Sequence, residues 1–419
     1  MGQLDSGNAA WILTSASLVF LMTPGVAFFY GGMVRAKAVL NMMIMEAAAL
    51  SVTMIMWVLW GWSIAYAGTS VGGIFGDPAT GFLLKDTMVS DKGVFTSAAL
   101  NGNNYPVSVD VAFQSAFAMI TVALICGAIA ERVKYSTWMI FVALWITFDY
   151  APLAHMVWNG GLLSADGAIS QAIGAAAHDF AGGTVVHINA AVAALVIVLI
   201  IGKRKGFGTQ PFRPHNVPFV MLGAFLLWFG WFGFNAGGAY AADGLAAYAF
   251  TNTTIAGSIA MIVWMLYDWH YDRKPSFSGV LVGAVAGLAT ITPCAGYVEP
   301  WAAIIIGAVG STVCYFAKNV QERFGFDDAL EVWRAHGMGG VTGALLLGIL
   351  ASANIDKVSA GIHQFLMQLL GVIIVAVYSF VVTIIILKVI NTWGPIRVTK
   401  EQEEAGLDET LHGEDAYKM

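Results

Sequence analysis

Eleven apolar stretches, each about 20 residues long, run through this chain of 419 residues. A helix of about 20 residues crosses the hydrocarbon core of a bilayer, which is roughly 30 Å thick. Apolar residues make up 58% of the chain and charged residues 11%, whereas soluble domains carry about 25% charged residues. We therefore predict an all-α integral membrane protein with eleven transmembrane helices, near residues 9–33, 42–68, 110–130, 136–158, 183–202, 217–240, 249–269, 277–295, 300–317, 335–352 and 362–390.

The composition also excludes several classes of function. The formal net charge is −6, and no basic run lies on an amphipathic helix, so we expect no nucleic-acid partner. The chain has no Walker A sequence, no T-V-G-Y-G filter and no Rossmann glycine run, and nothing in it supports catalysis. We expect neither an enzyme nor a cofactor. The three cysteines, Cys126, Cys294 and Cys314, lack metal-ligand spacing, so we also expect no metal site.

The distribution of basic residues predicts the orientation. If the N-terminus is outside, only Lys85, Lys92 and Lys357 of the 20 lysines and arginines face outward. Because basic residues next to short loops stay in the cytoplasm, this arrangement is the favoured one. After an odd number of spans the C-terminus is then cytoplasmic. We predict a multi-pass protein of the cell (inner) membrane.

Two parts of the chain resemble each other at a spacing of half its length. Residues 54–62 match residues 261–269, at an offset of 207. In spans 1 and 6, Leu21, Gly25, Phe29 and Gly32 match Leu226, Gly230, Phe234 and Gly237. Partners five spans apart point in opposite directions, so we predict an inverted repeat of spans 1–5 and 6–10, with span 11 peripheral. Chance similarity between apolar sequences is the alternative.

The segments between the spans are mostly short, which indicates a single membrane domain. We assign residues 1–391 to this domain and residues 392–419 to a charged cytoplasmic tail. Residues 69–109 form a polar external loop.

Six ionisable side chains fall within or beside the predicted spans, and each needs a partner or a role because a charge in hydrocarbon costs about 2.5–3.5 kcal/mol on insertion scales. They are Glu46, Asp149, His155, Asp179, His187 and His336. His187 and His336 belong to spans 5 and 10, and the glycines beside them let helices approach closely. We expect an uncharged pair that donates and accepts hydrogen bonds in an apolar path. The alternative is that each histidine only binds a backbone carbonyl.

A second group of candidate residues lies at the predicted outer face. Asp179 precedes Gly182 where span 5 begins, a favourable place for an N-cap, with attraction of a cation as the alternative role. Aromatic residues gather at the same face, namely Trp158, Phe113, Phe117 and Phe234. Rings at a pore mouth hold a small cation by cation–π attraction, worth about 0.5–2 kcal/mol. Packing in an interfacial aromatic belt is the alternative for any one ring.

At these residues the chain resembles the ammonium transporter family (Amt/Mep/Rh), and the likeness covers nearly all of the chain. The sequence D-F-A-G-G-T-V-V-H at 179–187 is similar to the family signature. Further similar motifs lie at 152–158, 230–237, 292–297 and 336–337. Residues 404–408 and 412–417 resemble the tail by which bacterial members couple their subunits and bind PII signalling proteins. The resemblance implies a homotrimer in the lipid bilayer, with one pore for ammonium or ammonia in each subunit.

The resemblance also implies roles for individual residues. Trp158 and Phe117, with Phe113 beside them, would form an external ammonium site that Asp179 organises from beneath. Phe117 and Phe234 would stack as a gate below that site. The pore would be lined by the twin histidines His187 and His336, together with Trp231 and Thr292.

One position departs from the family pattern. The serine that usually follows N-A-G is Gly238 here, so a weaker external site, or one that uses a backbone carbonyl or water, is expected. Glu46 and Asp149 also stand where relatives are ordinarily uncharged.

The resemblance favours transport in which ammonium loses a proton, ammonia crosses the pore and net charge moves. The alternatives are an electroneutral ammonia channel, an ammonium sensor that signals through its tail, and a sodium-coupled symporter.

Overall fold

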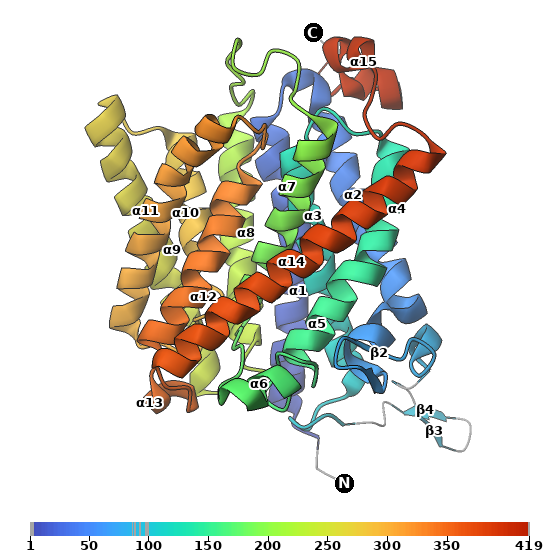
Figure 1. Ribbon diagram of the computed structural model, residues 1–419, viewed down its shortest axis with the longest axis vertical. Coiled ribbons are helices and arrows are strands. Elements are labelled where there is room, and N and C mark those ends of the chain that lie inside the picture. The colour runs from blue at the N-terminus through green and yellow to red at the C-terminus, as the bar shows by residue number, and fades with distance from the viewer. Residues whose placement is uncertain (1–3, 86, 88, 92–93, 97–99, 418–419) are drawn as a thin grey trace.

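The computed structural model describes residues 4–85, 87, 89–91, 94–96 and 100–417, and Lys92 lies outside them. The described chain is almost entirely helical (Figure 1). The membrane helices are α1 (Ser6–Met33), α2 (Val39–Met56), α3 (Val107–Ile129), α4 (Tyr135–Trp145), α5 (Ala151–Trp158), α7 (Asn189–Ile201), α8 (Val217–Gly237), α9 (Gly244–Asp272), α10 (Phe277–Ile291), α11 (Pro300–Phe324), α12 (Met338–Leu350) and α14 (Ile362–Trp393).

Several of these helices continue through π-helical segments, in which each turn holds an extra residue. They are η2 (Trp57–Gly61) and η3 (Ser63–Ala67) after α2, η5 (Ile146–Tyr150) between α4 and α5, η6 (Gly183–Ile188) before α7, and η7 (Trp333–Gly337) before α12. The shorter elements are α6 (Ala168–Ile173), α13 (Ala353–Asp356), α15 (Lys400–Ala405), η8 (Asp408–His412), β1 (Ser70–Val71), β2 (Phe75–Gly76), β3 (Val89–Asp91) and β4 (Val94–Thr96), with the 3₁₀ turns η1 (Ala36–Ala38) and η4 (Phe82–Leu84). The strands form two antiparallel hairpins in the predicted external loop.

Each of the eleven predicted ranges contains helix. Among the described residues, nine helices are long and apolar enough to cross a membrane, and Phe277–Ile291 is a shorter apolar helix. The predicted span 277–295 extends beyond α10, which ends at Ile291. The T-P-C-A-G-Y motif that follows forms a turn. The predicted last span, 362–390, stops short of the end of α14, which continues to Trp393. Gly394 follows with a φ of 152° and terminates the helix. The count of eleven membrane spans stays a prediction.

The first helices of the two predicted halves, α1 and α8, pack closely along each other. Glycines make this approach possible: a Cβ atom at Gly32 would lie 2.7 Å from the Asn216 carbonyl oxygen, and one at Gly233 would lie 2.8 Å from the Ser15 carbonyl oxygen. Helix α3 lies in the interior, where every residue from Phe113 to Ile129 is buried. In Figure 1, α14 runs obliquely across other helices, consistent with a peripheral last span.

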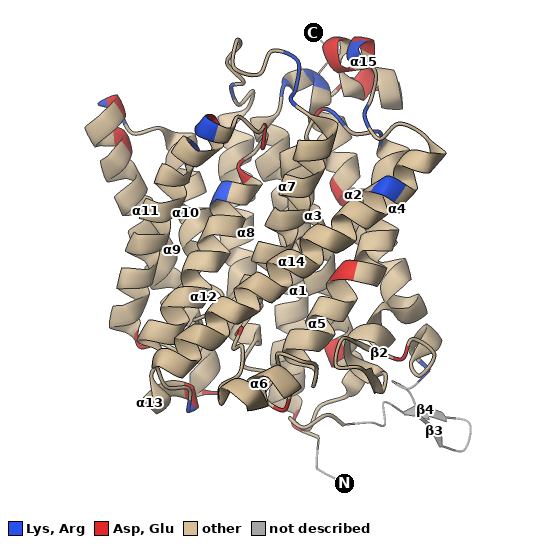
Figure 2. Ribbon diagram, viewed as in Figure 1, with Lys and Arg blue, Asp and Glu red and all other residues tan. Residues whose placement is uncertain are grey.

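The two ends of the molecule differ in charge. Most lysines and arginines lie at the end that carries the C-terminus, which we call the basic face, and the N-terminus lies at the opposite face (Figure 2). The tail is packed against the basic face. The Asp408 carboxylate accepts hydrogen bonds from the backbone N–H groups of Leu40 (3.1 Å) and Asn41 (2.7 Å), and Glu403 pairs with Arg397 at 2.7 Å.

A buried ion network joins three segments of the basic face. The Asp327 carboxylate accepts hydrogen bonds from Arg204 Nε at 2.9 Å, from Arg204 Nη2 at 2.8 Å and from Arg132 Nη1 at 3.2 Å. Burial alone raises the pKa of Asp327, but the hydrogen bonds and charges of the two arginines lower it below its ordinary value overall.

We predict that Asp327→Asn lowers stability by about 3–5 kcal/mol, because two buried guanidinium groups lose their counterion. The midpoint of thermal unfolding of the protein in detergent near neutral pH measures this. A carboxyl with a lowered pKa stabilises the fold above its ordinary pKa, and that stabilisation disappears as the pH falls through the lowered value. The wild type should therefore lose part of its advantage over the variant in acid.

The control is Glu322→Gln, which removes the exposed Lys318–Glu322 pair, 3.6 Å apart and about two-thirds exposed. It should change stability by no more than about 0.5 kcal/mol. Equal losses for the two variants would contradict the importance of the Asp327 network.

Candidate functional site

A pair of histidines lies in the interior of the molecule. The Nδ1 atoms of His187 and His336 are 3.3 Å apart, and their rings are nearly parallel, with centroids 5.1 Å apart. Both side chains are buried, and His187 Nε2 has no hydrogen-bond partner among the described residues. The predicted juxtaposition is thus present in the structure, and the alternative of separate carbonyl contacts does not describe this ring geometry.

The segment that carries His187 is held by Asp179. Its carboxylate accepts hydrogen bonds from the N–H groups of Gly182 (2.9 Å), Gly183 (2.6 Å), Thr184 (2.8 Å) and Val185 (3.1 Å), and from the Thr184 hydroxyl (2.5 Å). These N–H groups at the start of a helix have no partners within the helix itself. The residue at the N-cap position is Gly182, but the Asp179 carboxylate satisfies the free N–H groups as predicted for a capping residue, and its oxygens are occupied by these hydrogen bonds.

Asp328 holds the segment that carries His336 in the same way, and it was not among the residues predicted from the sequence. Its carboxylate accepts hydrogen bonds from the N–H groups of Val332 (3.1 Å) and Trp333 (2.7 Å) at the start of η7. Burial raises the pKa of Asp328 to about 6, although these hydrogen bonds oppose the rise. Asp179 and Asp328 each precede their histidine by eight residues. That equal spacing was a signal available in the sequence.

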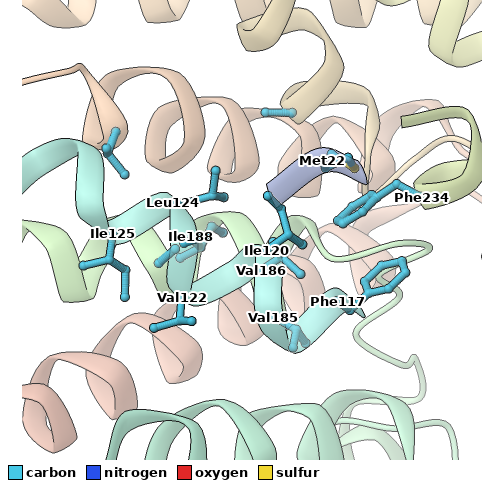
Figure 3. Packing of buried hydrophobic residues seen from close by; sticks show 14 of the residues in the cluster. Met22, Phe117, Ile120, Val122, Leu124, Ile125, Val185, Val186, Ile188 and Phe234 are labelled. Carbon is cyan, nitrogen blue, oxygen red and sulfur yellow. The ribbon is translucent and has the colours of Figure 1, made fainter. Parts of the chain in front are cut away.

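Aromatic rings lead from the surface to the histidine pair. Phe117 and Phe234 stack with centroids 4.2 Å apart and an angle of 17° between the rings. Trp158 and Phe113 meet Phe117 edge to face, at 6.2 Å and 4.9 Å. The Phe234 ring lies 5.9 Å from the His187 ring. In Figure 3 the two stacked rings lie at one end of a group of aliphatic side chains from α3 and η6.

Two predicted pore residues, Trp231 and Thr292, are hydrogen-bonded to each other next to His187. The Trp231 ring stacks on His187 at 5.4 Å, and its indole N–H donates to the Thr292 hydroxyl at 2.9 Å. That hydroxyl donates in turn to the Leu288 carbonyl at 2.8 Å. Thr292 is thus buried behind Trp231 and acts on His187 through it.

A hollow of about 280 Å³ opens beside Trp158, on the face opposite the basic one. Its lining includes Trp158, His178, Asp179 and Tyr297. The Trp158 indole N–H donates to the Asp179 carbonyl at 2.8 Å, which fixes the ring at the edge of the hollow. A second hollow, of about 520 Å³, lies at the basic face and is lined by aromatic, acidic and basic side chains that include Trp264, Asp268, Glu331 and Arg334.

Gly238 directly follows α8 and lies next to Phe180, in the segment that leads into η6. A Cβ atom at this position would lie 2.6 Å from the Phe180 carbonyl oxygen and 3.2 Å from the Phe180 ring. The glycine therefore allows the segment before η6 to approach the end of α8 closely.

The remaining ionisable candidates lie outside this row of side chains. His155 is hydrogen-bonded to the Ser70 hydroxyl (2.8 Å) and to the Ala65 carbonyl (3.3 Å), which indicates a structural role. Glu46 and Asp149 are buried, and their carboxylates have no hydrogen-bond partner within the described part of the chain. Among the described residues, no group of three or more His, Cys, Asp or Glu side chains is arranged to hold a metal ion.

Comparison with known proteins agrees with this arrangement. Residues 10–417 match the model of the Ammonium Transporter Family. An ammonium transporter of Mycobacterium tuberculosis is 44% identical over 439 aligned residues, covering 100% of this chain and 91% of the relative. The crystal structure of Saccharomyces cerevisiae Mep2 superposes with a TM-score of 0.84 at 30% identity, covering 95% of this chain and 91% of that one. A structure described as a Sensor Amt Protein gives a TM-score of 0.86 at 27% identity, covering 96% and 97%.

We predict that Gly238→Ser destabilises the protein by about 1–3 kcal/mol, the usual cost of overpacking, because the new Cβ atom meets the Phe180 carbonyl. The thermal midpoint in detergent tests this. The control is Gly244→Ser, since a Cβ atom there has no neighbour within 4 Å. A Gly238→Ser protein as stable as the Gly244→Ser protein would show that the Phe180 segment moves aside freely.

Proposed function

Because this chain belongs to the ammonium transporter family (Amt/Mep/Rh), we propose that its row of aromatic and histidine side chains is the path that the substrate follows. The protein is an ammonium transporter and not an enzyme. In the proposed mechanism, the ammonium ion is recruited in the hollow beside Trp158 and gives its proton to water there. Ammonia then passes Phe117 and Phe234, whose stacked rings move apart to admit it. The histidine pair then hydrogen-bonds ammonia and helps to pass on the proton.

The direct contact between His187 and His336 is the observation that carries this proposal. A neutral imidazole has one nitrogen that donates and one that accepts. Two such rings in contact give a polar link inside an apolar path, which suits a small polar solute or a proton. Potassium cannot shed its charge, whereas ammonium can, so a narrow apolar section below the hollow selects between them.

The recruitment step uses the outer rings. Trp158 lines the hollow and Phe117 and Phe113 lie behind it, and cation–π attraction to such rings is worth about 0.5–2 kcal/mol. Asp179 contributes by fixing Trp158 and the start of η6, without touching the ion. Gly238 offers no side-chain oxygen to the ion.

Two further candidates use the same fold. One is an electroneutral ammonia channel, in which the proton never crosses. The other is an ammonium sensor, favoured by Gly238 and by the similarity to a structure described as a Sensor Amt Protein.

We also propose a location and partners. The basic face is placed in the cytoplasm, because basic residues favour that side of the cell membrane. We propose a homotrimer with eleven membrane spans in each subunit, built from the inverted repeat and a peripheral last span. The tail, packed against the basic face over its described residues 392–417, lies on the proposed cytoplasmic side and is the proposed binding site of a PII signalling protein.

We predict that ammonium evokes a current in sealed proteoliposomes that contain the wild type, and that potassium does not. His187→Ala and His336→Ala should each reduce this current by about tenfold or more, equivalent to about 1.4 kcal/mol, or make it unselective, because the polar link is broken. His363→Ala is the control, since His363 lies exposed at the start of α14.

The outcomes separate the candidate functions. Full, selective current in both alanine variants would refute the role of the histidine pair. No current, together with a change of internal pH on addition of ammonia that is faster than in protein-free liposomes, would identify the electroneutral channel. Neither signal would favour the sensor.

A further inference from the structure

The hollow beside Trp158 contains a titratable ring that the proposed mechanism does not use. His178 lies in the segment between α6 and η6, directly before Asp179. It is partly buried and lines the hollow together with Trp158, Asp166 and Tyr297. Its ring centroid is 5.2 Å from that of Tyr297.

The main chain around His178 is fixed. Its N–H donates to the Ala176 carbonyl at 3.0 Å, and its carbonyl accepts from Gln368 Nε2 at 2.8 Å. Gln364 Nε2 holds the Ala176 carbonyl at 2.8 Å. Two glutamines of α14 therefore fasten this segment from behind, and the imidazole is presented at a defined place.

Three carbonyls around His178 are already engaged. The carbonyls of Ala176, His178 and Asp179 each accept a hydrogen bond, and the Asp179 carboxylate binds the start of η6. By contrast, the imidazole of His178 makes no hydrogen bond within the described residues. An ammonium ion has four N–H groups to satisfy, and Gly238 supplies no hydroxyl group to accept one of them.

We propose that His178 is a specificity-determining contact of the external ammonium site, where its neutral imidazole accepts a hydrogen bond from the bound ion. This inference rests on the proposed transport of ammonium through the hollow. It gives the hollow a side-chain acceptor in a chain that has Gly238 where the family usually has a serine.

The contact makes recruitment depend on external pH. A protonated imidazole has no acceptor and repels a cation. Burial lowers the pKa of His178, which keeps the ring neutral near pH 7. The titratable groups that face it are Asp166, Asp179 and Tyr297, with Asp356 near Tyr297, while α14 contributes the uncharged Gln364 and Gln368. Of these, Asp166 is exposed, so solvent screens its attraction for the ring and for the ion.

The test measures the half-saturating ammonium concentration for current in proteoliposomes, from about pH 7.5 to about pH 4.5, a range that extends well below the ordinary histidine pKa because burial lowers the pKa of His178. The pH is equal on both sides, and ammonium stays protonated throughout. For the wild type we expect this concentration to rise as the pH falls. His178→Leu should raise it by about tenfold at the higher pH with the maximal current unchanged, since a lost contact of about 1.4 kcal/mol affects binding rather than passage.

His178→Gln separates hydrogen bonding from titration. Glutamine keeps an acceptor but has no proton to gain in this range, so its half-saturating concentration should stay near the wild-type value and lose the dependence on pH. His363→Gln is the matched control, because it removes an exposed histidine at the start of α14, outside the hollow.

The two proposals fail in different ways. Wild-type affinity and a wild-type pH profile in His178→Leu would overturn the role of His178 while leaving transport intact. A wild type that gives neither current nor internal pH change would overturn the proposed function, and with it this inference.

Discussion

Two aspartate carboxylates fix the centre of this molecule, because each binds the free N–H groups at the start of a segment that carries a histidine. A helix begins with N–H groups that lack partners, and hydrocarbon offers no water to satisfy them. Asp179 satisfies those of η6 and Asp328 those of η7. Since each aspartate precedes its histidine by eight residues, His187 and His336 project from two similar segments and meet.

The two capping aspartates, Asp179 and Asp328, lie in different surroundings. Asp179 lies at the hollow beside Trp158, and its carboxylate accepts hydrogen bonds from four N–H groups and one hydroxyl group. Asp328 lies next to the buried Asp327 network at the basic face. Aromatic side chains thus lie near one aspartate, and a buried ion network lies near the other. This asymmetry supports recruitment at the face opposite the tail, while the paired geometry in the middle suits the inverted repeat.

The sequence predicted those parts of the structure that depend on local composition. Helix occurs in every predicted range, because length and apolarity decide whether a segment can span a bilayer. The glycines beside the histidines indicated close approach. The π-helical form of η6 and η7, and the position of Thr292 behind Trp231, could not be predicted. They depend on neighbours distant in sequence. One example is Pro293, which lies so close to Gly183 that a Cβ atom on Gly183 would be 2.5 Å from the Pro293 ring.

The stacked rings of Phe117 and Phe234 set the chemical problem that the rest of the proposed path solves. With centroids 4.2 Å apart, the rings are in contact and must separate before anything passes, and an ion that enters the narrow opening between them loses its water. Potassium would then enter the apolar section as a bare charge, at a high cost. Ammonium avoids that cost by crossing as ammonia, while the histidine pair passes the proton separately in the proposed mechanism. A path of this kind needs hydrogen-bond acceptors above the rings and a polar link below them. In the proposed path, His178 supplies the acceptor and the histidine pair supplies the polar link.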